Sequence, residues 1–427
     1  MLTNLLRIST LVPSTYVQMT SVWILVWDAF ISFTAHGLVS AIPVPQTSAA
    51  WSRAYSVKNM SSETITLTVS CLCKANVHSA TIPKSSLPLQ AHVCHCDTCR
   101  HISGSLYTSL AYWPAPRSTV DLSRYKSYNF SPPFDALFCP TCSAPVWGVF
   151  KDEKLPLLVA TGALENIACD TEVVKWAPQG FVGDTIDGGA SHWLKSINTS
   201  GPKLKSFKCS PRGDDAEELP ADWPTQPHTS EEKQDTLLIR CKCQGVHFLL
   251  HHNDYDGVKN EDLTWNVNPT TRKIKAELCG CDSCRLQGGT DVCYWTYSDM
   301  QNISFLSDKG ETGFPSDMDG LSALIDEHDP RVGSLKYYRS SPNVCRYFCG
   351  TCSATIFYAN KKRPHLIDIA VGVLEAKDGA RAEGMLWWPF ERGIGSKEDA
   401  NGGWREGVFG RIEKAAVEYG RTRDSSA

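Results

Sequence analysis

Cysteine is the residue whose spacing points most directly to chemistry. All but four of the 18 cysteines fall into C-x-C, C-x-C-x-x-C or C-x-x-C groups, and this set of three groups occurs twice along the chain. Closely spaced thiols are typical of zinc ligation, whereas disulfide frameworks belong mainly to small secreted domains. In a chain of 427 residues the clusters therefore favour metal ligation in a reducing compartment over disulfides or unliganded thiols.

The first and third groups of each set together supply four thiols, which suits a closed tetrahedral zinc site. Such a site would clamp two segments that are far apart in the sequence, and metal binding would contribute folding free energy directly. We expect two of these four-thiol sites, one made of Cys71, Cys73, Cys139 and Cys142, the other of Cys241, Cys243, Cys349 and Cys352.

The middle group of each set has only three thiols in one short loop, which predicts a zinc with one open ligand position. The candidate catalytic and ligating thiols are Cys94, Cys96 and Cys99 in the first set, and Cys279, Cys281 and Cys284 in the second. An open position can accept an external thiol and lower its pKa. Alternatively, a neighbouring residue completes a purely structural site. His95 is placed to do so in the first set, but Gly280 stands there in the second.

Other residues near the clusters have both a functional and an ordinary interpretation. Arg100 and Arg285 directly follow the three-thiol groups. They either offset the negative charge of the thiolates, bind an anionic substrate, or pair with a surface carboxylate. The ordinary interpretation is favoured for Glu165 and Glu375, as exposed carboxylates. The four remaining cysteines, predicted to be buried packing residues, are Cys169, Cys209, Cys293 and Cys345.

The elements that must position the thiols are predicted to be mainly strands. Apolar and polar residues alternate from Ile65 to Val77 and again from Leu237 to Leu249, the pattern of a half-buried strand. Residues i and i+2 of a strand share a face, so each C-x-C group would point both thiols the same way. Helix is predicted to be sparse, with the best candidates at Ile412 to Tyr419 and Leu321 to Glu327.

A duplication organises the chain. Twenty residues after the last cysteine of each set comes a Gly-x-Leu-Glu motif, at Gly162 and at Gly372, and the cluster order is the same in both sets. We expect an N-terminal extension at 1–59, a first zinc domain at 60–200, a linker at 201–235, a second zinc domain at 236–415 and a tail at 416–427.

The extension is apolar from Val22 to Ile42 but contains Asp28 and His36, which a clean membrane span should lack. Three interpretations stay open: a weak anchor or signal, a packed or disordered segment, or sequence upstream of a natural start at Met60. Apart from this segment we expect no membrane contact and a cytoplasmic protein. The net charge of −4 gives no electrostatic reason to expect a nucleic-acid partner.

The order C-x-C, C-x-C-x-x-C-R, F-C-x-x-C resembles the glutathione-dependent formaldehyde-activating enzyme family, also called the centromere protein V/GFA domain family. The resemblance covers roughly 64–200 and 235–410. It implies a mainly β fold of two tandem Mss4-like zinc-binding domains, of β-sandwich or β-tent form, each with about two Zn²⁺ divided as above. The sequence departs from the family pattern at Lys74 and Gln244, after the C-x-C groups, and at Gly280, so the second copy is expected to have diverged further.

The activity that the resemblance implies is carbon–sulfur lyase chemistry. We therefore expect a zinc-dependent, lyase-like enzyme that acts on adducts of a small thiol such as glutathione with small aldehydes. Two alternatives remain at this point. One is a non-catalytic binding or scaffold module that zinc stabilises, and the other is a redox or metal-buffering protein.

Overall fold

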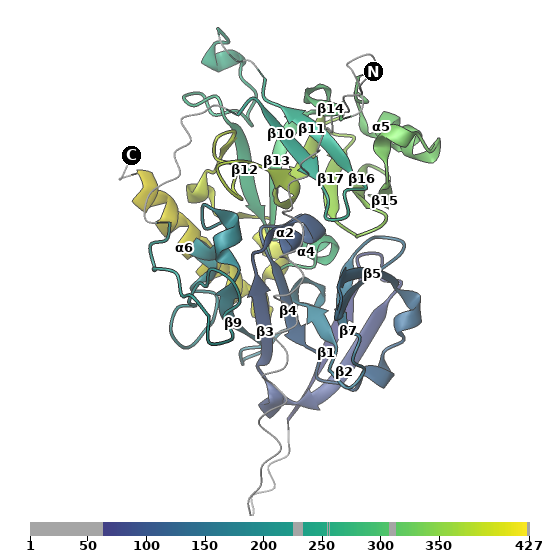
Figure 1. Ribbon diagram of the computed structural model, residues 1–427, viewed down its shortest axis with the longest axis vertical. Coiled ribbons are helices and arrows are strands. Elements are labelled where there is room, and N and C mark those ends of the chain that lie inside the picture. Colours follow the sequence, from purple (N-terminus) through teal and green to yellow (C-terminus); the bar gives the residue numbers. More distant parts are fainter. Residues whose placement is uncertain (1–62, 225–233, 254, 256, 307–312, 425–427) are drawn as a thin grey trace, which may run out of the picture.

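The computed structural model describes residues 63–224, 234–253, 255, 257–306 and 313–424. The expected N-terminal extension at 1–59 lies outside these residues. We call 63–224 the first half and the described residues from 234 onward the second half. Figure 1 shows the first half in the lower part of the view and the second half above it, with helices α2 (Asp97–Ser103) and α4 (Asp282–Gly288) between them.

The first half is built from two sheets. β1 and β2 form an antiparallel hairpin, and the remaining strands form a seven-stranded sheet of order β5-β6-β7-β8-β4-β3-β9. The strands are β1 (Thr64–Ser70), β2 (Val77–Pro83), β3 (Leu89–Cys94), β4 (Thr108–Tyr112), β5 (Lys126–Ser131), β6 (Phe134–Phe138), β7 (Pro145–Phe150), β8 (Leu158–Ala160) and β9 (Val174–Gly180).

The second half also has a smaller and a larger sheet. The smaller has the order β14-β11-β10-β19, and the larger follows β15-β16-β17-β18-β13-β12-β20, with β21 also paired to β12. The strands are β10 (Thr236–Arg240), β11 (His247–His251), β12 (Ile274–Cys279), β13 (Cys293–Asp299), β14 (Ile303–Phe305), β15 (Leu335–Ser341), β16 (Val344–Cys349), β17 (Thr355–Asn360), β18 (Leu366–Ala370), β19 (Leu374–Glu375), β20 (Leu386–Trp387) and β21 (Ile394–Gly395).

The two large sheets follow the same path, apart from the additional strand β21 in the second. In each, a meander of four strands leads to two central strands, β4 and β3 or β13 and β12. A short helix, α2 or α4, connects these two central strands in the chain. The last strand pairs in parallel in both sheets, β9 with β3 and β20 with β12. The predicted mainly β class is therefore confirmed.

The C-x-C groups lie in tight turns and not on strands, so the prediction of one strand from Ile65 to Val77 is wrong. β1 ends at Ser70, and the turn to β2 is closed by a hydrogen bond from the Lys74 amide to the Cys71 carbonyl (3.0 Å). Lys74 takes a φ of 59° there. Alternation continues into the turn because Cys71 is still buried on the core face of β1. The predicted strand from Leu237 to Leu249 is interrupted in the same way.

Both predicted helices are present, as α5 (Met318–Asp326) and α6 (Trp404–Asp424). The predicted tail at 416–427 is wrong over 416–424, because α6 continues there and packs on the first half. Tyr419 stacks on His192 of α3 (Ser191–Leu194), with ring centroids 4.3 Å apart. Among the described residues, no helix combines the length and the apolarity that a membrane span requires.

The segment expected to be a linker is attached to the first half over 201–224. The Phe181 amide donates to the Cys209 carbonyl (2.7 Å), and the Gln179 amide donates to the Lys205 carbonyl (2.9 Å). These bonds run along the end of β9 and extend the edge of the sheet beyond its last strand. The segment therefore packs on the first half and does not form a free linker between the halves.

The two halves meet through a reciprocal pair of backbone contacts. The Gly162 amide donates to the Gly289 carbonyl (3.2 Å), and the Gly372 amide donates to the Gly104 carbonyl (2.9 Å). Gly104 and Gly289 cap the C-terminal ends of α2 and α4 in the left-handed conformation. A Cβ on Gly162 or Gly372 would clash with the opposing backbone, so each Gly-x-Leu-Glu motif needs its glycine for this close approach.

Candidate metal centres and the adjoining pocket

The four-thiol groups converge as the sequence predicts. The sulfurs of Cys71, Cys73, Cys139 and Cys142 lie within 4.8 Å of one another, and so do those of Cys241, Cys243, Cys349 and Cys352. Within the first cluster, the Cys73 sulfur is 3.5 Å from that of Cys71 and 3.6 Å from that of Cys139. Four sulfurs about 2.3 Å from a zinc ion lie about 3.8 Å apart, so the thiols are spaced to hold one.

Turn geometry supports the closed clusters. The Asn76 amide points at the Cys71 sulfur (3.3 Å), and in the second half the Val246 amide points at the Cys241 sulfur (3.3 Å). Such N–H groups favour the thiolate form that a metal requires. The hydrogen bond from Cys241 also lowers the pKa of Cys243 to about 7. The turn in each half, where a continuous strand was predicted, therefore directs both the thiols and the amides toward one point.

The three-thiol clusters also form, but at the start of a helix. Cys94 ends β3, Cys96 caps α2 and Cys99 lies in its first turn, where the Cys99 amide donates to the Cys96 sulfur (3.4 Å). The sulfurs of Cys94 and Cys96 are 3.5 Å apart. The second cluster, Cys279, Cys281 and Cys284, has the same arrangement around α4, with a 3.4 Å bond from the Cys284 amide to the Cys281 sulfur.

His95 does not complete the first three-thiol cluster. Its ring is fully buried and its Nε2 atom lies 3.0 Å from the side-chain oxygen of Gln179, on β9. Burial lowers the pKa of His95 to about 4. At the corresponding position of the second half, a Cβ on Gly280 would lie 2.7 Å from the Phe409 ring, so no side chain fits there. In neither half does the residue between the first two thiols join the metal cluster.

The arginines after the clusters pair with carboxylates one helical turn earlier. Arg100 bonds to Asp97, and the Arg285 Nε atom donates to Asp282 (2.7 Å). Arg285 is buried and also donates to the carbonyl oxygens of Gly162 (2.6 Å) and Leu164 (2.8 Å) in the first half. Its position favours a role in holding the halves together over substrate binding.

The two motif carboxylates form ordinary ion pairs. Glu165 pairs with Lys74 (3.2 Å), and Glu375 pairs with Arg240. Of the four unclustered cysteines, Cys293 and Cys345 are buried as predicted, Cys169 is half-buried, and Cys209 is exposed, so the packing prediction is wrong for Cys209. None of the 18 cysteines is in a disulfide, and all lie in the described part of the chain.

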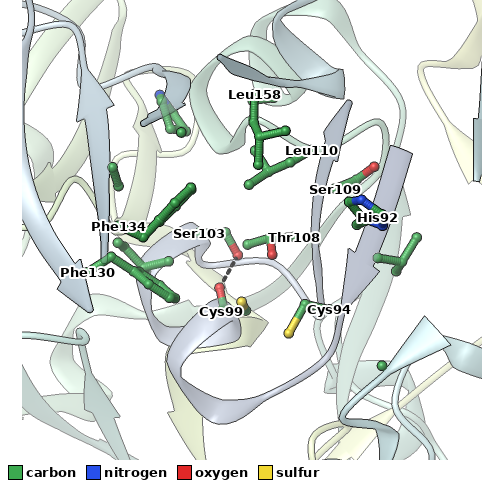
Figure 2. Close-up of a pocket in the computed structure, with 18 of the residues that line it drawn as sticks. His92, Cys94, Cys99, Ser103, Thr108, Ser109, Leu110, Phe130, Phe134 and Leu158 are labelled. Carbon is green, nitrogen blue, oxygen red and sulfur yellow. Dashed lines mark hydrogen bonds between the residues drawn. The ribbon is translucent and has the colours of Figure 1, made fainter. Parts of the chain in front are cut away.

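A cavity of about 190 Å³ opens beside the first three-thiol cluster, with Cys94 and Cys99 in its lining. Figure 2 shows these two cysteines at its base, Phe130 and Phe134 on one side, and Leu110 on another. Backbone from the second half, at 288–290, and from the segment at 210–212 completes the wall. Sequence reasoning identified the thiols at its base but missed these walls, which come from strands and segments with no motif of their own.

The corresponding space in the second half is filled. In the first half, β6 and β7 place Ala136 opposite Gly148. The corresponding strands β16 and β17 place Arg346 opposite Tyr358. The Arg346 guanidinium is buried, lies 5.0 Å from the Tyr358 ring centre, and has its Nη1 atom 3.7 Å from the Cys284 sulfur. The second cluster therefore faces a cation where the first faces open apolar space.

At two further positions that line the cavity in the first half, the second half also carries a bulkier or a charged residue. Leu110 pairs with Ala160 on β8, and the residue in the same register of the second half is Trp295, which is buried against Tyr358. The position of Leu158 is taken by Asp368, which pairs with Arg363 (3.0 Å). Bulky and charged residues thus replace the small and apolar ones that line the first cavity.

No curated protein and no solved structure matches the chain. A family match covers part of the first half, from β1 to the end of β9. This stretch includes the four-thiol cluster, the three-thiol cluster and most of the cavity wall. The match fits the observed cysteine geometry, because both kinds of cluster of the first half fall within the matched residues. Residues 66–180 are thus similar to the family described as glutathione-dependent formaldehyde-activating enzyme.

Proposed function

We propose that the first half is a zinc-dependent enzyme that cleaves, and in reverse forms, the carbon–sulfur bond of adducts between a small thiol such as glutathione and an aldehyde. The observation that supports this most is the three-thiol cluster of Cys94, Cys96 and Cys99 at the base of an apolar cavity of about 190 Å³. The family match over 66–180 supports glutathione as the thiol.

The reaction needs no oxidant or reductant. In the adduct, one carbon carries both the sulfur and a hydroxyl group. Cleavage leaves the bonding electron pair on sulfur, while the hydroxyl loses its proton and becomes the aldehyde carbonyl. Zinc held by three thiolates would offer its open position to the substrate sulfur and stabilise it as a thiolate. The chain's own part is to hold that sulfur beside Cys94 and Cys99 and to exclude water with the aromatic wall.

We infer that the halves are two copies of one domain, at 60–200 and 236–415, and that the second is a structural, non-catalytic copy. The matching strand order of the large sheets, apart from β21, supports duplication. Arg346 and Tyr358, which occupy the space next to Cys284, support a structural second copy. Reduced cysteine clusters of this kind are typical of the cytoplasm, where we propose that the protein acts.

Cys96→Ser is expected to lower kcat/KM for a glutathione–aldehyde adduct by more than about 100-fold, because the loss of a direct ligand should exceed the 10- to 100-fold cost of losing a ligand's hydrogen-bond partner. Cys281→Ser, the matched change in the second half, is expected to leave turnover within about twofold. Turnover is measured by aldehyde release, with metal content determined in parallel. Equal turnover in Cys96→Ser and the unaltered protein would count against the enzyme and favour a binding module.

Arg346→Ala is expected to weaken metal binding by the second three-thiol cluster about 10- to 100-fold, because the guanidinium no longer offsets the thiolate charge at Cys284. A chelator titration followed by elemental analysis should then show one metal equivalent leaving earlier. The control is Arg339→Ala, which removes a partly exposed arginine that pairs with Asp319. Superimposable titration curves for Arg346→Ala and Arg339→Ala would remove the assigned role of Arg346.

A further inference from the structure

The cavity beside the first three-thiol cluster is larger than a one-carbon aldehyde needs. Its volume is about 190 Å³. An engineered apolar cavity of about 150 Å³ is enough to bind benzene. A formaldehyde-derived carbon attached to sulfur near Cys99 would leave most of this space empty, and unfilled apolar space contributes nothing to binding.

The cavity wall is a set of mutually supported aromatic rings. Phe134 lies between Phe130 and Phe150, with ring centroids 6.0 Å and 5.1 Å away and edge-to-face angles of 81° and 61°. Trp147 adds a fourth aromatic side chain to the lining. Interlocked rings resist collapse into the space, so the cavity is preformed.

Glycine at two positions keeps the space open. A Cβ on Gly148 would lie 2.3 Å from the Cζ atom of Phe134, so this glycine lets the tip of the ring approach β7 closely. Gly289 of the second half, which also lines the cavity, adopts a φ of 70°, and a Cβ there would lie 2.7 Å from the Pro145 ring. The second copy thus supplies part of the first copy's wall, and the cavity exists only when the halves are packed together.

The geometry points to a substrate class. We propose that the first half acts on thiol adducts of aldehydes that carry an apolar group about the size of one aromatic ring, with the ring held among Phe130, Phe134 and Trp147. This rests on the proposed function and specifies its substrate. Bond cleavage is as stated above: the bonding electron pair stays on sulfur, the carbon becomes the carbonyl of an aromatic or similarly bulky aldehyde, and the hydroxyl proton passes to solvent.

Binding of unreactive thioethers tests the substrate class independently of turnover. S-benzylglutathione and S-methylglutathione share the peptide and the sulfur and differ only in the apolar group. We expect the benzyl compound to bind the zinc-loaded protein at least about tenfold more tightly by calorimetry, since one well-fitted methylene alone is worth about 10-fold or more. Equal affinities would overturn the substrate class.

Leu110→Trp places in the first cavity the residue that Trp295 provides in the second half, and is expected to abolish the benzyl preference while metal content stays unchanged. Leu306→Trp, at an exposed position that does not line the cavity, is expected to retain the preference. Ala136→Leu fills the same space from β6 and is expected to reproduce the Leu110→Trp result. A preserved benzyl preference in both cavity variants would overturn the assignment of the cavity as the binding site.

Turnover separates this inference from the proposed function. If the protein cleaves glutathione adducts of formaldehyde and of benzaldehyde with equal kcat/KM, the substrate class fails and the proposed function stands. If it cleaves neither adduct and binds neither thioether, both fail. A preference of at least about tenfold in kcat/KM for the benzaldehyde adduct supports both.

Discussion

Cys142→Ala is expected to cost the protein most of the stability of its first half. Cys142 is fully buried, and its sulfur lies in the four-thiol cluster that joins the β1–β2 turn to the turn after β6. Structural zinc contributes about 10–16 kcal/mol in small zinc domains, whereas whole domains are stable by only about 5–15 kcal/mol. Loss of one ligand should therefore remove one metal equivalent and prevent cooperative folding of residues 63–224.

The control for Cys142→Ala is Cys345→Ala. Cys345 is equally buried, but its sulfur contacts the Ser322 hydroxyl (3.7 Å) and lies outside the four clusters. Its removal is expected to cost about 1 kcal/mol, as for loss of a small buried apolar group. Denaturant unfolding with elemental analysis compares the two variants. Equal metal content and equal unfolding midpoints would show that the four-thiol cluster does not clamp the fold.

The cysteine clusters were predictable because closely spaced thiols leave a dense local signature in the sequence. C-x-C and C-x-x-C spacings restrict where thiols can point, and the repeat of that order defined four groups that the structure brings together. The turn at Lys74 was not predictable in the same way. Its positive φ is carried by lysine and not by glycine, so the residue type did not mark the turn, and the alternation up to Cys71 concealed it.

The cavity could not be derived from the first half alone. Its lining depends on which residues face each other across neighbouring strands, such as Ala136 and Gly148. It also depends on the backbone at 288–290, at the end of α4 in the second half. One signal was present in the sequence. Counting back two residues from the F-C pair gives alanine in the first half and Arg346 in the second, a change from a small to a charged residue on a core-facing element.

Asp291→Ala is expected to destabilise the protein by about 3–5 kcal/mol, the cost of leaving a buried charge without its partner. Asp291 is fully buried in the second half. It accepts hydrogen bonds from the Arg405 Nε atom (2.9 Å) and from the Thr161 hydroxyl of the first half (2.6 Å). Arg405 is itself buried, and burial together with the nearby Arg285 lowers its pKa to about 9. Without the carboxylate, that charge loses its buried ion-pair partner and keeps contacts with the Thr161 carbonyl oxygen and the Trp404 ring.

A second substitution distinguishes a broken ion pair from a general packing defect. Asp291→Ala combined with Arg405→Met removes both charges, and because apolar replacement of a buried pair is often neutral, the double variant should recover most of the lost stability. Asp319→Ala, which breaks exposed ion pairs, should cost no more than about 1 kcal/mol of stability.

Because Asp291 directly follows the 288–290 wall of the cavity, Asp291→Ala should also weaken S-benzylglutathione binding. A double variant less stable than Asp291→Ala would mean that Arg405 stabilises the interface through its other contacts.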